Sequence, residues 1–153
     1  MVKVLGEERA RLLDRTRTVE KMKIPFSLHS DSPVIATGPL EMIEIAVNRD
    51  VVTRPGYVLS PDEKISVETA IRAVTSVPAW QMFSEGELGS LEAGKLADLV
   101  ILASDPRKVE SENIGEIKGV GNLDRRQARL RAEGGNAAPV NPICRFRSQQ
   151  KFV

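Results

Sequence analysis

A short apolar segment, Ile24–Leu28, ends directly at a polar cluster formed by residues 29–32. The length and composition of this segment predict a buried β-strand, since Pro25 is tolerated near the start of a strand. The cluster carries Asp31 and His29, which is the only histidine of the chain. Enzymes built as α/β barrels hold their catalytic groups at the ends of such strands. This junction therefore favours an α/β fold and marks Asp31 as a candidate site residue.

Helical patterns surround the predicted strand. Residues 7–23 predict a charged surface helix, and Leu40–Val47 predicts a short helix that is apolar on most sides. Ser60 followed by Pro61 is typical of a helix start, and a second helix with one apolar face is predicted from Ser66. The order helix, strand, loop, helix fits the edge of an α/β unit.

A second strand, Leu96–Leu102, is predicted after a turn-rich stretch. Asp98 falls on the apolar face of this strand, so we expect it to be buried and to accept hydrogen bonds from turn amides near Gly94. Trp80 and Phe83 lie in the apolar stretch before the turns and are expected in the core. These three side chains are predicted to have structural roles.

Composition excludes several classes of protein. The chain has 153 residues, about the length of one domain, and its formal net charge of +1 gives no general attraction to nucleic acid or membranes. The one cysteine, Cys144, excludes an internal disulfide and a thiolate metal cluster. No run approaches the ~18 apolar residues of a membrane span, and residues 1–14 are too charged for a signal peptide. We therefore expect a soluble, cytoplasmic protein.

Charge divides the chain into an acidic body and a basic tail. Residues 1–117 carry 14 basic and 19 acidic side chains, whereas residues 118–153 carry eight basic and two acidic ones. From Gly119 onward the apolar periodicity fades, which predicts a disordered tail. Few aromatic residues accompany the arginines of this tail, so we do not expect it to bind nucleic acid.

Three stretches together resemble a known enzyme family. They are residues 24–34 with Gly38–Leu40, the helix-forming stretch Ser66–Thr75, and Gly89–Leu102. In this order and spacing they resemble the end of the barrel in metal-dependent amidohydrolases of the amidohydrolase-3 type, the group that includes N-substituted formamide deformylase. The resemblance covers roughly residues 4–118.

The resemblance implies an α/β fold in three parts. Residues 1–84 correspond to the C-terminal segment of a (β/α)8 barrel, with its last strand and helices. Residues 85–118 correspond to the return of the chain into a small β domain. Residues 119–153 match nothing in the family, and we hypothesise that this tail is translated out of frame.

The resemblance also implies a reaction, the hydrolysis of amide-type, non-peptide C–N bonds in small molecules with the help of a divalent metal, expected to be zinc. Asp31 matches the family carboxylate that touches the metal or its water and carries a proton from the attacking water to the leaving nitrogen. His29 is expected to line the mouth of the barrel. Ser30 and Ser32 are expected to hold Asp31 in place through backbone hydrogen bonds.

Most metal ligands of the family have no counterpart in this chain, because His29 is its only histidine. A catalytic zinc site typically takes three protein ligands, and Asp31 is the one metal ligand that we assign here. We therefore expect the isolated chain to bind no metal tightly and to be inactive. Three interpretations stay open: the C-terminal fragment of an amidohydrolase, a non-catalytic relic or interaction fragment that associates with other copies, and a small self-standing α/β domain with unpaired sheet edges.

Overall fold

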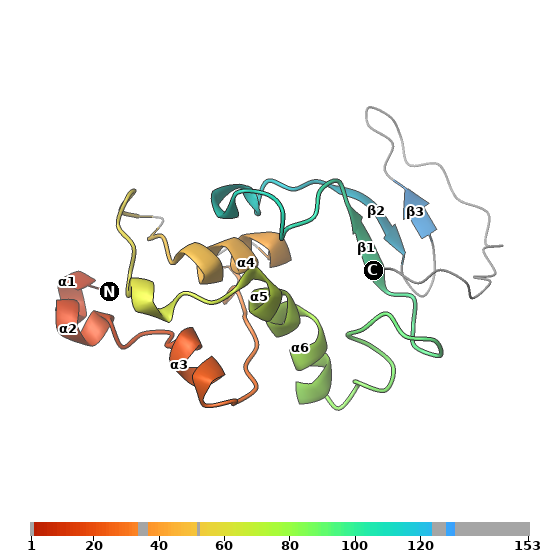
Figure 1. Cartoon of the computed structure of the whole chain (residues 1–153), viewed down its shortest axis with the longest axis horizontal. Helices are drawn as coiled ribbons and strands as arrows, with labels where there is room; N and C mark the ends of the chain where they lie inside the picture. The colour runs from red at the N-terminus through yellow and green to blue at the C-terminus, as the bar shows by residue number, and fades with distance from the viewer. Residues whose placement is uncertain (1, 34–36, 52, 124–127, 131–153) are drawn as a thin grey trace.

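Helices form the N-terminal half of the structure, and a small sheet follows them (Figure 1). The computed structural model describes residues 2–33, 37–51, 53–123 and 128–130. Its elements are, in chain order, α1 (Val2–Leu5), α2 (Glu7–Ala10), α3 (Thr16–Lys21), α4 (Pro39–Asn48), the 3-10 turn η1 (Pro61–Glu63), α5 (Val67–Val74), α6 (Ser76–Gln81), β1 (Leu99–Leu102), the 3-10 turn η2 (Ser111–Asn113), β2 (Gly119–Leu123) and β3 (Ala128–Leu130). None of the helices in these ranges is long and apolar enough to cross a membrane.

The predicted helices α4 and α5 are confirmed, and both begin at local sequence signals. Pro39 occupies the first turn of α4, where a missing amide N–H costs no helical hydrogen bond. Ser66 precedes α5, and its hydroxyl oxygen accepts a hydrogen bond from the amide of Thr69 at 3.1 Å. The predicted helix start at Pro61 is a single 3-10 turn, η1.

The hydrophobic core lies where α4 and α5 pack together. Its buried members are Ile43, Ala46, Ile65, Ala70 and Ile114. Phe26 and Leu28 pack against this cluster from the extended segment before α4. Ile114, which follows η2, is the largest fully buried side chain of the described residues. The core is therefore small, and it joins the two central helices to segments on either side of them.

The single helix predicted over residues 7–23 is wrong, because the chain forms α2 and α3 with a break between them. Asp14 lies in the break with φ 49°, a left-handed conformation that ends a helix. The buried Arg49 guanidinium donates hydrogen bonds to the carbonyl oxygens of Leu13 at 3.0 Å and Asp14 at 2.7 Å. In a continuous helix these two carbonyl oxygens would accept hydrogen bonds from amides four residues on. Here they accept hydrogen bonds from Arg49 instead, and the helix is interrupted.

The strand predicted at Ile24–Leu28 is also wrong. The segment is neither a helix nor a paired β-strand. No described strand pairs with it, and two of its amides donate to helix carbonyls instead: Ile24 to Val19 of α3 at 3.2 Å, and Leu28 to Ala73 of α5 at 3.0 Å. A β-strand needs a neighbour to pair its amides and carbonyls, and the described part of the chain offers none here.

The sheet is antiparallel, with strand order β1-β2-β3. Leu99 pairs with Leu123, and Val100 pairs with Asn122. β1 confirms the predicted second strand in a shorter form. Because β2 and β3 are strands, order continues past Gly119, where the sequence predicted a disordered tail. Residues 124–127 and 131–153 of that tail lie outside the described residues.

Helices with a small sheet agree with the α/β class, and the described residues contain no closed barrel. The sheet stands beside the helices in Figure 1, joined to them by extended connections. Three expected core positions are exposed: Trp80 (52%), Phe83 (94%) and Asp98. Trp80 lies on α6 and Phe83 just after it, and no described layer packs over that side of the helix. Asp98 precedes β1 and is exposed, although it is not without an interaction partner.

Candidate functional site

The candidate residue Asp31 lies where the sequence placed it, at the end of the extended segment Ile24–Leu28. Residues 31–33 form a turn, and Asp31 has φ 51°, a left-handed conformation that aspartate tolerates better than most residues. Its backbone amide donates a hydrogen bond to Nδ1 of His29 at 3.2 Å. The turn thus joins the backbone of Asp31 to the His29 ring, a contact that the sequence analysis did not predict.

The carboxylate of Asp31 is exposed, and no described residue bonds to it. The bonds expected from Ser30 and Ser32 are not found between described residues. An exposed, unengaged carboxylate can accept a proton or contribute one oxygen to a metal. Among the described residues, no neighbour fixes the direction of the Asp31 carboxylate, and its catalytic role stays a prediction.

The residues that the structure describes do not fit a bound divalent metal. Within them no group of three or more His, Cys, Asp or Glu side chains converges on a point where an ion could bind. Asp31 and His29 together offer two ligands at most, while a catalytic zinc typically has three from the protein. The donor set of the described residues is therefore insufficient for the metal that the family resemblance implies.

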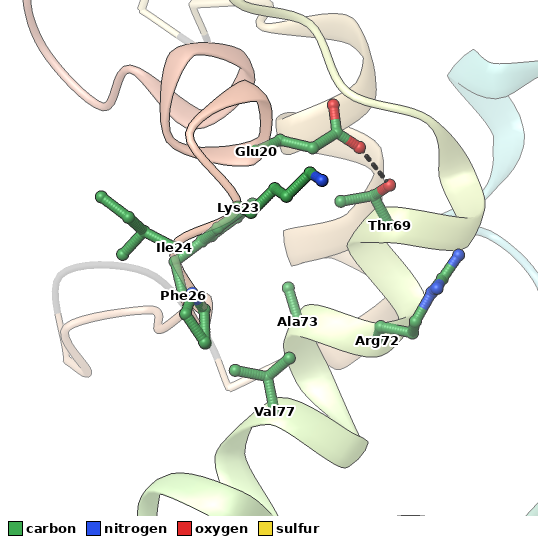
Figure 2. Close-up of a pocket in the computed structure, with 9 residues that line it drawn as sticks. Glu20, Lys23, Ile24, Phe26, Thr69, Arg72, Ala73 and Val77 are labelled. Carbon is green, nitrogen blue, oxygen red and sulfur yellow. Dashed lines mark hydrogen bonds between the residues drawn. The ribbon is translucent and has the colours of Figure 1, made fainter.

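A separate pocket of about 330 Å³ lies between α3, residues 23–26 and the adjoining helices α5 and α6 (Figure 2). Its polar side chains are Glu20, Lys23, Thr69 and Arg72, and its apolar ones are Ile24, Pro25, Phe26, Ala73 and Val77. A smaller hollow of about 250 Å³, lined by Pro25, Ser76, Val77 and Trp80, shares Pro25 and Val77 with it. Asp31 lines neither of them, so the predicted site and the pocket are distinct.

Glu20 links two helices across the pocket. It accepts a hydrogen bond from the hydroxyl of Thr69 on α5, drawn as a dashed line in Figure 2, and pairs with Arg17 on its own helix. These bonds from Thr69 and Arg17 hold the pKa of Glu20 below its usual value, although burial opposes them. Glu20 therefore stays ionised and engaged at neutral pH, which suits a structural role.

Sequence reasoning missed this pocket because its walls come from segments far apart in the chain. Glu20 and Thr69 are separated by 49 positions, and no spacing within either segment indicates that they meet. The apolar lining around Ile24 was visible in the sequence, but it indicated a strand of the core. The pocket offers an apolar surface and a charged rim, and Glu20 is the one carboxylate among its lining residues.

Comparison with known proteins gives one family and two curated relatives. Residues 1–132 match the amidohydrolase family. N-substituted formamide deformylase of Arthrobacter pascens is 34% identical over 114 residues, which is 74% of this chain and 21% of that protein. Protein LONG AFTER FAR-RED 3 of Arabidopsis thaliana is 40% identical over 80 residues, 52% of this chain and 14% of that protein. No solved structure matches the chain.

Two facts about extent follow from these matches. The chain spans about a fifth or less of the length of the curated relatives. The family match also continues to residue 132, so the end of the resemblance predicted at residue 118 is too early. Out-of-frame translation stays a hypothesis for the residues beyond 132.

Proposed function

Because this chain belongs to the amidohydrolase family, we propose that it is part of a hydrolase acting on amide-type, non-peptide C–N bonds of small molecules. The observation that carries the proposal is the family match over residues 1–132, with the formamide deformylase as a 34% identical relative. Within this proposal, residues 1–84 supply the last strand and helices of a (β/α)8 barrel. The turn at Asp31 then lies at the mouth of that barrel, where such enzymes keep their catalytic groups.

Asp31 is the catalytic residue of the proposal. Its carboxylate takes a proton from the water that attacks the carbonyl carbon, and a new C–O bond forms as the carbonyl becomes tetrahedral. The same carboxyl then gives the proton to the leaving nitrogen as the C–N bond breaks. The exposed position of Asp31 and the hydrogen bond of its amide to His29 support this role, since the carboxylate is open to substrate and water.

The metal of the proposed enzyme, taken to be zinc, is outside what this chain can hold alone. Asp31 contributes one ligand, and the described residues offer no cluster that completes the coordination. We therefore propose that these 153 residues alone are inactive.

A graft tests the role of Asp31. Residues 1–132 of this chain replace the corresponding segment of the Arthrobacter pascens deformylase, and hydrolysis of an N-substituted formamide is measured. We expect a folded graft to be active and the variant Asp31→Asn to lose about 10²–10⁴ in kcat, the usual contribution of a general acid–base group. The exposed Asp50→Asn is the matched control and should change kcat little.

The outcomes separate the parts of the proposal. A folded graft without activity would contradict the assignment to a C–N hydrolase. An active graft in which Asp31→Asn and Asp50→Asn behave alike would show that Asp31 is no catalytic residue.

The second candidate function is that of a non-catalytic interaction fragment. It is favoured by large apolar side chains that are exposed in the described structure, among them Met22 (64%), Ile24 (48%) and Trp80 (52%). An inactive graft together with stable association of the chain with itself would support this alternative.

A further inference from the structure

The backbone that leads to Asp31 is anchored to a helix three residues earlier. The amide of Leu28 donates a hydrogen bond to the carbonyl oxygen of Ala73 at 3.0 Å, and Ala73 is a buried residue of α5. The side chain of Leu28 packs against the hydrophobic core. His29, the next residue, therefore extends from an anchored point of the backbone, although its own side chain is exposed.

The turn at residues 31–33 starts in a conformation that is unfavourable without support. Asp31 has φ 51°, a left-handed value at which a Cβ crowds the backbone. Its amide donates a hydrogen bond to Nδ1 of His29 at 3.2 Å. Among the residues that the structure describes, this is the one hydrogen bond that Asp31 makes. The His29 ring is therefore the group that ties this turn to the anchored segment before it.

The hydrogen bond follows from the covalent structure of histidine. Asp and Asn side chains form turns by accepting a hydrogen bond from the amide two residues on, through an oxygen bonded to Cγ. Nδ1 of His29 is also bonded to Cγ, and it accepts from the amide at the same spacing. To accept, Nδ1 must carry no proton, so the proton of the neutral ring is on Nε2. Another side chain with an acceptor bonded to Cγ should therefore replace His29 in this contact.

We infer that His29 is a positioning residue for Asp31, which it holds in the left-handed turn through Nδ1. This inference rests on the proposed function, in which Asp31 is the catalytic carboxylate. Because no described residue bonds to that carboxylate, its position depends on the backbone that carries it. His29 thus takes the supporting role that the sequence analysis gave to Ser30 and Ser32.

Amide exchange in the 153-residue chain, followed by NMR, tests the hydrogen bond itself. His29→Asn keeps an acceptor oxygen on Cγ, whereas His29→Leu places a carbon there and is the matched comparison. We expect the Asp31 amide to exchange about two- to tenfold faster in His29→Leu than in the unchanged chain, the usual worth of one hydrogen bond. His29→Asn should keep the slow exchange. Both variants should keep the melting temperature, because the His29 side chain is exposed.

The graft of residues 1–132 into the Arthrobacter pascens deformylase tests the consequence for catalysis. We expect His29→Leu to lower kcat by about 10- to 100-fold, because a misplaced catalytic group stabilises the transition state poorly. KM should stay within about twofold, since the groups that bind the substrate are unchanged. His29→Asn should restore most of kcat. Such a rescue would exclude a role for the Nε2 proton of the ring, because asparagine has no counterpart of that group.

Equal exchange of the Asp31 amide in the unchanged chain and in His29→Leu would overturn the inference. So would equal kcat values in the unchanged graft and in His29→Leu, or a kcat in His29→Asn as low as that in His29→Leu. An inactive graft with the expected exchange pattern would retain the hydrogen bond of His29 and reject the proposed function. An active graft that depends on Asp31 and not on His29 would do the reverse.

Discussion

Glu63 shows at the residue scale how a buried charge joins distant parts of this chain. Its side chain, only 8% exposed, accepts hydrogen bonds from the backbone amide of Thr18 at 2.8 Å and from the Thr18 hydroxyl. Arg15 approaches the same carboxylate at 3.5 Å. Because Thr18 lies in the first turn of α3, Glu63 satisfies a helix amide that would otherwise lack a partner.

Removing this carboxylate should destabilise the protein. We expect Glu63→Ala to lower the free energy of unfolding by about 2 kcal/mol, the usual worth of hydrogen bonds to a charged, buried group. Glu68→Ala is the control, because Glu68 pairs with Arg72 at 3.1 Å on the exposed face of α5. It should cost about 0.5 kcal/mol or less. Urea unfolding of the two variants checks the difference, and equal losses would refute the role of Glu63.

The same group predicts how stability depends on pH. Burial raises the pKa of Glu63, but hydrogen bonds from Thr18 and Arg15 outweigh it, so the pKa lies below its ordinary value of 4.5. The stabilisation is therefore fully present above about pH 4.5 and is lost as pH falls through the lower pKa of the folded state. Melting temperatures measured from pH 7 down to pH 3 should fall less steeply for Glu63→Gln than for the unchanged chain. Parallel curves would contradict this.

The position of some residues could be predicted from the sequence, and that of others could not. Asp31 could be placed at the end of an extended segment because its neighbours in the chain determine that position. The burial of Glu63 could not be predicted, because its partner Thr18 is 45 positions away. Lys23 and Arg72 were missed at the pocket for the same reason, since folding alone brings them together.

At the scale of elements, Gly89 controls how the turn after α6 approaches that helix. Its φ is +87°, and a Cβ built on it would lie 2.6 Å from the Cβ of Ala79 and 3.0 Å from the Cα of Ser76. Both residues belong to α6. Gly89 is thus required for two reasons. Its positive φ favours glycine, and a Cβ at this position would overlap α6.

A pair of glycine variants separates these two requirements. Gly56 also has a positive φ, +77°, but nothing lies within 4 Å of a Cβ added there. Gly56→Ala should therefore cost about 1 kcal/mol, for the left-handed conformation alone. Gly89→Ala should cost about 1–3 kcal/mol more, because the methyl group also overlaps α6. Thermal unfolding of both variants measures the difference, and similar losses would show that α6 moves aside freely.

Elements could be predicted from sequence where local signals decide them. Pro39 and Ser66 mark the starts of α4 and α5, and both helices form as predicted. The helix over residues 7–23 failed because Arg49, far along the chain, bonds to carbonyls in its middle. The strand at Ile24–Leu28 failed because a strand depends on a partner, which no periodicity within the segment reveals.

At the scale of the whole molecule, the fold class was visible while the architecture was not. A closed (β/α)8 barrel takes about 250 residues, more than this chain has, so its local patterns cannot show how the elements close. The exposed apolar side chains of Ile24, Trp80 and Phe83 were expected to be buried, in a strand or in the core. Their exposure is consistent with a sequence shaped for a larger assembly than the described residues form.

This view of the whole molecule predicts that the chain alone does not catalyse the proposed reaction. A catalytic zinc needs three protein ligands and an open position, and the 153-residue sequence has one histidine, with no convergent ligand group among the described residues. The purified chain, incubated with zinc and an N-formyl amine, should therefore release amine no faster than a blank without protein. The Arthrobacter pascens deformylase under the same conditions is the control for substrate and detection. If the chain hydrolyses the substrate and a chelator abolishes this activity, the prediction is wrong. Such activity would require a metal site, and the described residues contain no convergent group of ligands.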